Sequence, residues 1–297
     1  MSIPGFSHQR VPVAPDVALH VATGGSGSPV VLLHGFPQTH LMWRHVAADL
    51  AAEHTVIVPD LRGYGASDKP ADGYRKTTMA TDVITLARAL GHDRFALAGH
   101  DRGALVAIRT ALDHPRHVSH LLSLDVLPLP DMWEVMRGVS AAVGWHLYLM
   151  AQPPGLPEQL IAGSPDAFFG SFLDQWTRDP AAIPPDVRAA YLRACREAVP
   201  SIVADYRASA TVDLADDLRA RELGQTLAMP VTVLQQDWGA ELGFDARSRW
   251  SAWAPDLDHR TVSCGHFMAE EAPGEVTAAL RQLLLRDGVP PVPTGSR

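Results

Sequence analysis

The stretch Ala98-Gly99-His100-Asp101-Arg102-Gly103-Ala104 decides the fold of this chain. An apolar, strand-like segment, Phe95–Ala98, leads into it, and apolar residues recur at helical spacing over 105–112. A strand, a sharp turn with small residues and a helix form the context of a nucleophile elbow, G-x-Nuc-x-G. The glycines let the turn hold its central residue in a strained conformation, because neighbouring Cβ atoms would clash there.

The central residue of this turn is Asp101, and not serine or cysteine. A carboxylate nucleophile attacks a saturated carbon that carries a leaving group, and it leaves an alkyl ester on the enzyme. It is poorly suited to cleaving ordinary esters or amides, which disfavours a serine-type esterase. Because Gly and Asp cluster in many turns, G-x-D-x-G alone is a weak signal, and its weight depends on the rest of the chain.

Size and composition fit one large α/β domain with an inserted subdomain, since 46% of the 297 residues are hydrophobic. The net charge of −8, with mixed signs along the chain, argues against nucleic-acid and membrane-surface binding. The first residues do not resemble a signal peptide, and no apolar run approaches transmembrane length. Cys195 and Cys264 show no metal-type spacing, so we expect a cytoplasmic protein with reduced, core-filling thiols.

Strand and helix patterns alternate on either side of the elbow. They are a hairpin and a buried strand (11–33), a helix (about 41–53), a strand (55–58), a helix (about 77–90), and the segments around Asp101. This alternation implies right-handed crossovers and a mostly parallel sheet with helices on both faces. Active sites gather at the carboxyl ends of such strands, where His34, Asp60 and Asp101 lie.

The pattern changes after a strand at 121–124 that ends at Asp125. Short helical segments rich in Trp, Tyr and Leu follow, joined by prolines, and we interpret 127–224 as a helical lid. The core domain then comprises 1–126 and 225–287. In its second part alternation resumes, with strands at 231–234 and 259–262 and helices at about 247–253 and 275–285. We expect a disordered tail at 288–297.

Three residues follow the chain order nucleophile, acid and base of the α/β-hydrolase triad: Asp101, Asp125 and His266. Asp101 would form the ester, and His266 would deprotonate the water that hydrolyses it. Asp125 would fix the tautomer of His266 and stabilise its imidazolium form. Other acids follow the next strand and are alternatives for the acid of the triad: Asp237, Glu241 and Asp245.

The segment His34-Gly35-Phe36-Pro37 would place the backbone N–H of Phe36 near Asp101. With the backbone N–H of Arg102, it would form an oxyanion hole for the tetrahedral intermediate of ester hydrolysis. This chemistry needs no metal and no organic cofactor.

Several stretches, spread over almost the whole chain and including the lid, match a known family. They are His34–Gln38, Asp60–Asp68, Gly99–Ala104, Ala111–Pro115, Ala151–Pro153, Asp205–Ala208 and Gly265–Pro273. They resemble the fluoroacetate (haloacetate) dehalogenases and related epoxide hydrolases of the α/β-hydrolase superfamily. The resemblance implies the α/β-hydrolase fold, Asp101 as nucleophile, Asp125 as acid and His266 as base.

The resemblance also implies roles for three further residues. His146 and Tyr206, from the lid, would reach the leaving group, and Arg102 would contact a substrate carboxylate where one is present. Relatives of this type often dimerise, which makes a homodimer an expectation here. The aromatic residues Trp133, Trp145, Tyr148 and Trp176 are expected to line or pack the lid, with no chemistry assigned to them.

Two positions depart from the dehalogenases that cleave C–F bonds. Their elbow resembles H-D-R-G-x-R, whose second arginine clamps the carboxylate, and here that position is Leu105. Their lid carries His-Trp, whose indole helps to hold fluoride, and here His146 is followed by Leu147. Leucine offers no charge-assisted bond, and losing the indole donor is expected to lower the rate roughly 10²-fold.

The residues that remain favour an epoxide hydrolase. In one branch of similar epoxide hydrolases a His/Tyr pair from the lid opens the ring, and His146 with Tyr206 would suffice for this, without a carboxylate clamp. The alternative is a haloacid dehalogenase with an altered substrate range, which Arg102 favours. A non-catalytic binding protein with this fold is a third interpretation, and the complete triad argues against it.

Overall fold

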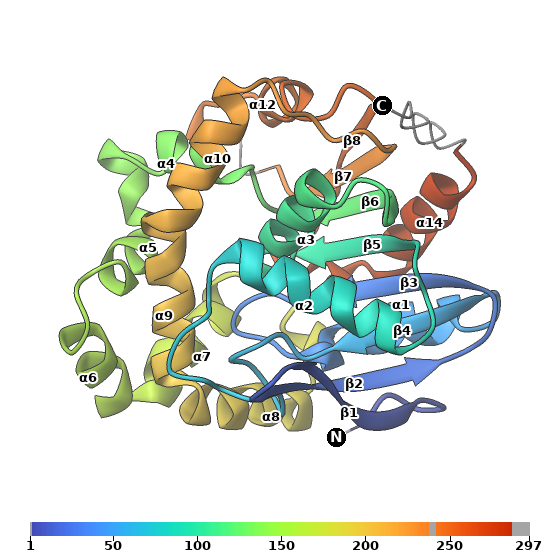
Figure 1. Ribbon diagram of the computed structural model, residues 1–297. Helices are drawn as coiled ribbons and strands as arrows, with labels where there is room; N and C mark the ends of the chain where they lie inside the picture. The colour runs from blue at the N-terminus through green and yellow to red at the C-terminus, as the bar shows by residue number, and fades with distance from the viewer. Residues whose placement is uncertain (1, 238–241, 287–297) are drawn as a thin grey trace.

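The computed structural model describes residues 2–237 and 242–286. Within these ranges, eight strands form one sheet in the order β1-β2-β4-β3-β5-β6-β7-β8 (Figure 1). The pairs β1–β2 and β2–β4 are antiparallel, and all other neighbours are parallel. The strands are β1 (Ser7–Ala14), β2 (Val17–Gly24), β3 (Ser28–Leu33), β4 (His54–Pro59), β5 (Phe95–His100), β6 (Val118–Leu124), β7 (Val231–Gln235) and β8 (Leu257–Thr261).

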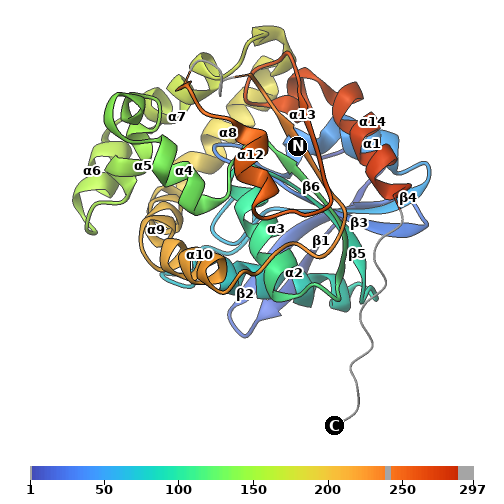
Figure 2. The same cartoon turned by 90° about the horizontal axis from the view of Figure 1, so that it is seen from above.

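Helices cover both faces of the sheet, which is why its central strands are continuously apolar. The side chains of Val30–Leu33 in β3 and of Val56–Val58 in β4 are fully buried. One face carries α2 and α3, and the other carries α1 and α14 (Figures 1 and 2). These helices are α1 (Arg44–Leu50), α2 (Lys76–Ala89), α3 (Arg102–Asp113) and α14 (Pro273–Leu284). The predicted fold class, a mostly parallel α/β sheet with helices on both faces, is thereby confirmed.

A helical insertion joins β6 to β7 and lies beyond the carboxyl ends of the parallel strands (Figure 1). Its elements are α4 (Leu129–Val135), η2 (Gly138–Ala142), α5 (Trp145–Met150), α6 (Leu156–Gly163), α7 (Pro165–Gln175), η3 (Pro180–Ala182), α8 (Pro185–Glu197), α9 (Val199–Ala210) and α10 (Val212–Glu222). All of them fall inside the segment 127–224 predicted as a lid. The division into a core domain and a lid at those boundaries stays a prediction, and 288–297 lies outside the described residues.

Several element boundaries differ from the predictions. In place of one helix at 41–53, a short 3-10 turn, η1 (His40–Trp43), precedes α1, and the Thr39 side chain caps the start of this turn by accepting from the N–H of Leu41. Strand β6 begins three residues before the predicted strand, at Val118. The remaining helices are α12 (Ala246–Ser251) and α13 (Met268–Glu271). None of the helices within 2–237 and 242–286 has the length and apolar character needed to cross a bilayer. Cys195 and Cys264 are buried free thiols.

Candidate active site

The turn between β5 and α3 holds Asp101 in a conformation that L-residues rarely adopt, with a φ of +48°. The turn depends on two close approaches. A Cβ on Gly99 would lie 2.5 Å from the carbonyl oxygen of Gly103, and one on Gly103 would lie 2.4 Å from that of His34. Only glycine fits at these two positions, so the backbone geometry of a nucleophile elbow is present. Backbone strain of this kind is stored preferentially at functional sites.

The loop after β3 supplies a hydrogen-bond donor to the elbow. The backbone N–H of Phe36 donates to Oδ1 of Asp101 at 2.8 Å. Arg102 directly follows Asp101 as the first residue of α3, and the leading N–H groups of a helix have no partner within it. The N–H of Phe36 thus lies against the carboxylate of Asp101, and the oxyanion hole formed with the N–H of Arg102 stays a prediction.

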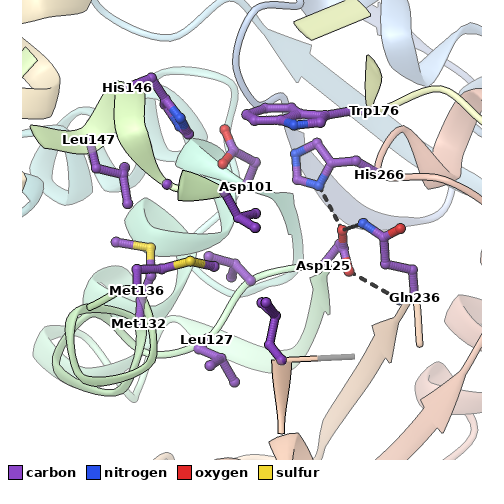
Figure 3. A pocket seen from close by; sticks show the side chains of 14 residues that line it. Asp101, Asp125, Leu127, Met132, Met136, His146, Leu147, Trp176, Gln236 and His266 are labelled. Carbon is purple, nitrogen blue, oxygen red and sulfur yellow. Dashed lines mark hydrogen bonds and ion pairs between the residues drawn. The ribbon is translucent and has the colours of Figure 1, made fainter. Parts of the chain in front are cut away.

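An imidazole and a carboxylate from distant segments meet beside the elbow. Nδ1 of His266 lies 2.6 Å from Oδ2 of Asp125, directly after β6 (Figure 3). Asp125 is also held in an unusual conformation, with a φ of +50°, and among the described non-glycine residues only it and Asp101 have a positive φ. Burial alone would lower the pKa of His266, but the hydrogen bond and charge of Asp125, with a contribution from Asp101, raise it above the usual 6.5.

Gln236, which directly follows β7, holds Asp125 from the other side. Its backbone N–H donates to Oδ1 at 3.0 Å and its side-chain amide donates to Oδ2 at 2.8 Å (Figure 3). The sequence analysis did not single out Gln236, although its place just after a parallel strand was a usable signal. Of the alternative acids, Asp245 caps α12 through Ser248, Asp237 is exposed, and Glu241 lies outside the described residues.

The tautomer of His266 follows from these contacts. An ionised Asp125 only accepts hydrogen bonds, so Nδ1 of His266 carries the proton and Nε2 carries the lone pair. Nε2 is buried and has no hydrogen-bond partner within the described residues. The carboxylate of Asp101 lies between the rings of His146 and His266 (Figure 3). This arrangement can deprotonate a water molecule next to an ester on Asp101.

Two residues of the helical insertion lie close to the elbow. His146 on α5 stacks on Phe36 with ring centroids 6.1 Å apart, and Tyr206 on α9 lies 5.6 Å from His146. Nδ1 of His146 and the hydroxyl of Tyr206 are buried, and no described residue offers either a hydrogen bond. Burial lowers the pKa of His146 to about 3, whereas burial and the charge of Asp101 raise the pKa of Tyr206 well above 10. Both side chains are therefore neutral near pH 7 and can act as hydrogen-bond donors.

The guanidinium of Arg102 points away from this cavity, in contrast to the expected contact with a substrate carboxylate. Its Nε donates to Oδ2 of Asp205 at 2.7 Å, and one terminal nitrogen donates to the backbone of Asp205 and to the hydroxyl of Ser209. It also lies over the ring of Tyr206, 4.1 Å from the centroid. Asp205 and Ser209 thus bind the guanidinium of Arg102, which links α3 to α9 of the insertion.

A cavity of about 180 Å³ opens between the elbow and the insertion. Of the two leucines that replace dehalogenase residues, Leu147 lines the cavity, whereas Leu105 is buried and does not. Of the four lid aromatics, only Trp176 reaches it; Trp133 packs on Tyr148, and Trp145 on Phe172. The lining comprises Asp101, Asp125, Val126, Leu127, Met132, Met136, Val143, Gly144, His146, Leu147, Trp176, Gln236, Leu242 and His266. No feature of the sequence singled out the apolar wall.

Comparisons with known proteins identify the family of this chain. A family model described as alpha/beta hydrolase fold matches residues 28–273. Fluoroacetate dehalogenase from Burkholderia sp. is 36% identical over 94% of each chain, and soluble epoxide hydrolase from Corynebacterium sp. (strain C12) is 35% identical over 86% of this chain and 89% of its own. A solved structure from Pseudomonas aeruginosa, provisionally described as an epoxide hydrolase, has a TM-score of 0.91 and 37% identity, covering 96% of this chain and 97% of its own. The chain therefore belongs to the α/β-hydrolase fold family and is related there to fluoroacetate dehalogenase and epoxide hydrolases.

Proposed function

We propose that this protein is an epoxide hydrolase that converts an uncharged, largely apolar epoxide to a vicinal diol. Asp101 attacks one ring carbon, which breaks the carbon–oxygen bond and leaves a hydroxyalkyl ester on the enzyme. The released ring oxygen takes its proton from Tyr206, while His146 donates a hydrogen bond to it. The absence of charge on either donor before the reaction fits this role.

Hydrolysis of the ester regenerates the enzyme. Nε2 of His266 takes a proton from water, and the hydroxide attacks the carboxyl carbon of Asp101. The Phe36 and Arg102 backbone N–H groups stabilise the oxyanion. As the intermediate collapses, the departing diol oxygen takes the proton from His266, and the proton shed by Asp101 restores Tyr206. Asp125 stabilises the imidazolium in between.

The observation that carries the proposal is the character of the cavity wall. Among the lining residues that the structure describes there is no Lys or Arg, and seven of the fourteen are Leu, Val or Met. A substrate carboxylate would lose its hydration there, next to the carboxylate of Asp101 and without a cationic partner, at a large cost in free energy. An apolar epoxide carries no such charge.

A haloacid dehalogenase is the alternative, and the match to fluoroacetate dehalogenase over 94% of both chains favours it. For this activity Arg102 would have to leave Asp205 and turn toward the cavity. The side chain of Leu147, next to His146, offers no donor for a departing halide.

Trapping of the ester tests both activities. In a His266→Gln variant the base is lost, so the ester on Asp101 should accumulate. We expect intact-mass spectrometry to show an adduct with styrene oxide and none with chloroacetate or fluoroacetate. An additional Asp101→Asn substitution is the control and should abolish the adduct. An adduct with a haloacetate alone would assign the protein to the dehalogenases instead.

An ¹⁸O experiment covers a third outcome, in which none of these probes forms an adduct. Wild-type protein that turns over a substrate in ¹⁸O-water should incorporate label into the carboxylate of Asp101. Turnover without label would overturn Asp101 as nucleophile. The absence of turnover for a wider set of epoxides and haloacids would favour the non-catalytic binding protein.

A further inference from the structure

Three histidines from separate segments converge at the edge of the sheet, on the β1–β2 side of the elbow. His8 is on β1, His20 is on β2 and His40 begins η1. In the register of the hairpin His8 pairs with Ala22, and Ala22 is two residues from His20, so His8 and His20 lie on the same face. The ring centroids of the three imidazoles lie 4.7, 5.1 and 5.6 Å apart. We call this group the histidine cluster.

Asp60, at the end of β4, fixes two of the three rings. Its Oδ1 accepts from Nδ1 of His40 at 2.8 Å, and its Oδ2 lies 3.0 Å from Nδ1 of His20. The backbone N–H groups of His40 and Ala66 also donate to this carboxylate, at 2.8 and 2.9 Å. Four donors therefore surround a buried, ionised carboxylate, and they hold both rings in fixed orientations.

The tautomers follow from the acceptor-only character of Asp60. Because Nδ1 of His20 and Nδ1 of His40 donate to it, Nε2 of each neutral ring carries a lone pair. Nε2 of His40 is buried and has no hydrogen-bond partner within the described residues. Nε2 of His20 lies 3.1 Å from Nδ1 of His8. One ring nitrogen from each histidine lies within 4.8 Å of one from each of the others.

These distances suit a small divalent metal ion. Zn–N bonds of about 2.0–2.1 Å at tetrahedral angles place neighbouring ligand nitrogens about 3.3 Å apart. The His8–His20 separation of 3.1 Å is already close to this value, and small rotations of the rings would bring the third nitrogen, now within 4.8 Å of the others, to the same distance. A carboxylate that receives the other N–H of a ligand histidine is the usual support of such sites.

We propose that His8, His20 and His40 form a binding site for a divalent transition-metal ion of the Zn²⁺ class, with Asp60 orienting two of the ligands. The ion receives the lone pair of the buried Nε2 of His40, which no described residue satisfies. His8 supplies Nδ1 and moves its proton to Nε2, on the solvent side. Three imidazoles leave a fourth position for water. The ion would join the β1–β2 hairpin to η1, separate from the chemistry at Asp101.

The test is calorimetric titration of chelator-treated protein, without a polyhistidine tag, with Zn²⁺. We expect one ion per chain, and affinity at least about tenfold weaker in His8→Gln and in His20→Gln. His45→Gln is the matched control, because His45 is an exposed histidine outside the cluster, and it should bind as the wild type does. Circular dichroism of each variant without metal shows whether it is folded.

Co²⁺ provides a second measurement on the same variants. Coordination by the three imidazoles should produce visible d–d absorption in the wild type and in His45→Gln, and this absorption should be absent from His8→Gln. The proposal is overturned if the wild type binds no stoichiometric Zn²⁺ up to about 1 mM. Equal binding by His8→Gln, His20→Gln and the wild type would overturn it as well. A water molecule would then be the partner of His40.

Discussion

Asp125 and Asp60 perform the same local task at two places on the carboxyl edge of the sheet. Each follows a parallel strand, is buried, and accepts a hydrogen bond from Nδ1 of an imidazole. Each carboxylate therefore keeps the proton of its histidine on Nδ1, so that the lone pair lies on Nε2, on the other side of the ring. What differs is the group that this lone pair faces. The ring of His266 lines a cavity together with a strained carboxylate, whereas the ring of His40 lies beside two further imidazoles.

This difference shows that an oriented imidazole does not define a chemistry by itself. Beside an ester on Asp101 it can act as a general base, because a water molecule can be deprotonated at the reacting carbon. Beside other imidazoles it can act as a metal ligand where several lone pairs point to one place. The first arrangement requires the cavity, and the second requires only that three side chains converge.

The largest expected effect comes from Asp125→Asn. Loss of the charge leaves the imidazolium unsupported and permits the wrong tautomer, so ester hydrolysis should slow about 10³- to 10⁴-fold. Since the pKa of His266 is raised above 6.5 and the neutral ring is the base, wild-type hydrolysis should fall as the pH drops through that raised pKa. In the variant this fall should move to lower pH. Rapid-quench measurement of the ester in single turnovers gives both results.

Asp237→Asn is the control for this experiment. Asp237 was an alternative acid in the sequence analysis, and it is exposed. Its substitution should leave the rate of ester hydrolysis within about twofold of wild type. A large effect of Asp237→Asn together with a small effect of Asp125→Asn would exchange their roles.

An intermediate effect is expected at the other carboxylate, from Asp60→Asn without metal. One amide oxygen cannot accept all four donors, and the new NH₂ group would face N–H groups, so at least two buried or part-buried donors lose their partner. We expect the free energy of unfolding to fall by about 3 kcal/mol, measured by urea denaturation. Asp93→Asn, at a side chain that is 90% exposed, should change it by less than about 0.5 kcal/mol. Equal midpoints for both variants would contradict the structural role of Asp60.

The smallest effect is expected from Gln236→Met, which removes one side-chain donor from Asp125 at similar size. Asp125 keeps the backbone N–H of Gln236, so its position is weakened and not lost. Ester hydrolysis should slow roughly tenfold, with formation of the ester unchanged. Such a result would distinguish the two carboxylates: Asp125 depends partly on the side-chain amide of Gln236. The donors to Asp60 other than imidazoles are backbone N–H groups, which a side-chain substitution leaves in place. An unchanged rate would show that Gln236 is dispensable.

The core of the fold was predictable because its signals are local. Periodicity marked the strands of the parallel sheet and the helices between them, and the glycines around Asp101 marked a turn that only small residues can make. Chain order and a resemblance to known enzymes predicted that Asp125 and His266 form a triad with Asp101. Helix ends were less predictable, as η1 shows, because a single side chain such as Thr39 can fix where a helical turn begins.

What the sequence determined by itself is the order of the elements, the strained elbow with its aspartate, and the identity of the groups at the strand ends. Only the tertiary structure decided what each of these groups faces. The sequence shows that Arg102 is a cation, but only the structure shows that its guanidinium binds Asp205, about a hundred residues away, and not the cavity. Likewise, His8, His20 and His40 show no ligand spacing along the chain; strand pairing brings His8 beside His20, and Asp60 holds His40 next to them. Side-chain chemistry is local, whereas the direction of a lone pair or a charge depends on long-range packing.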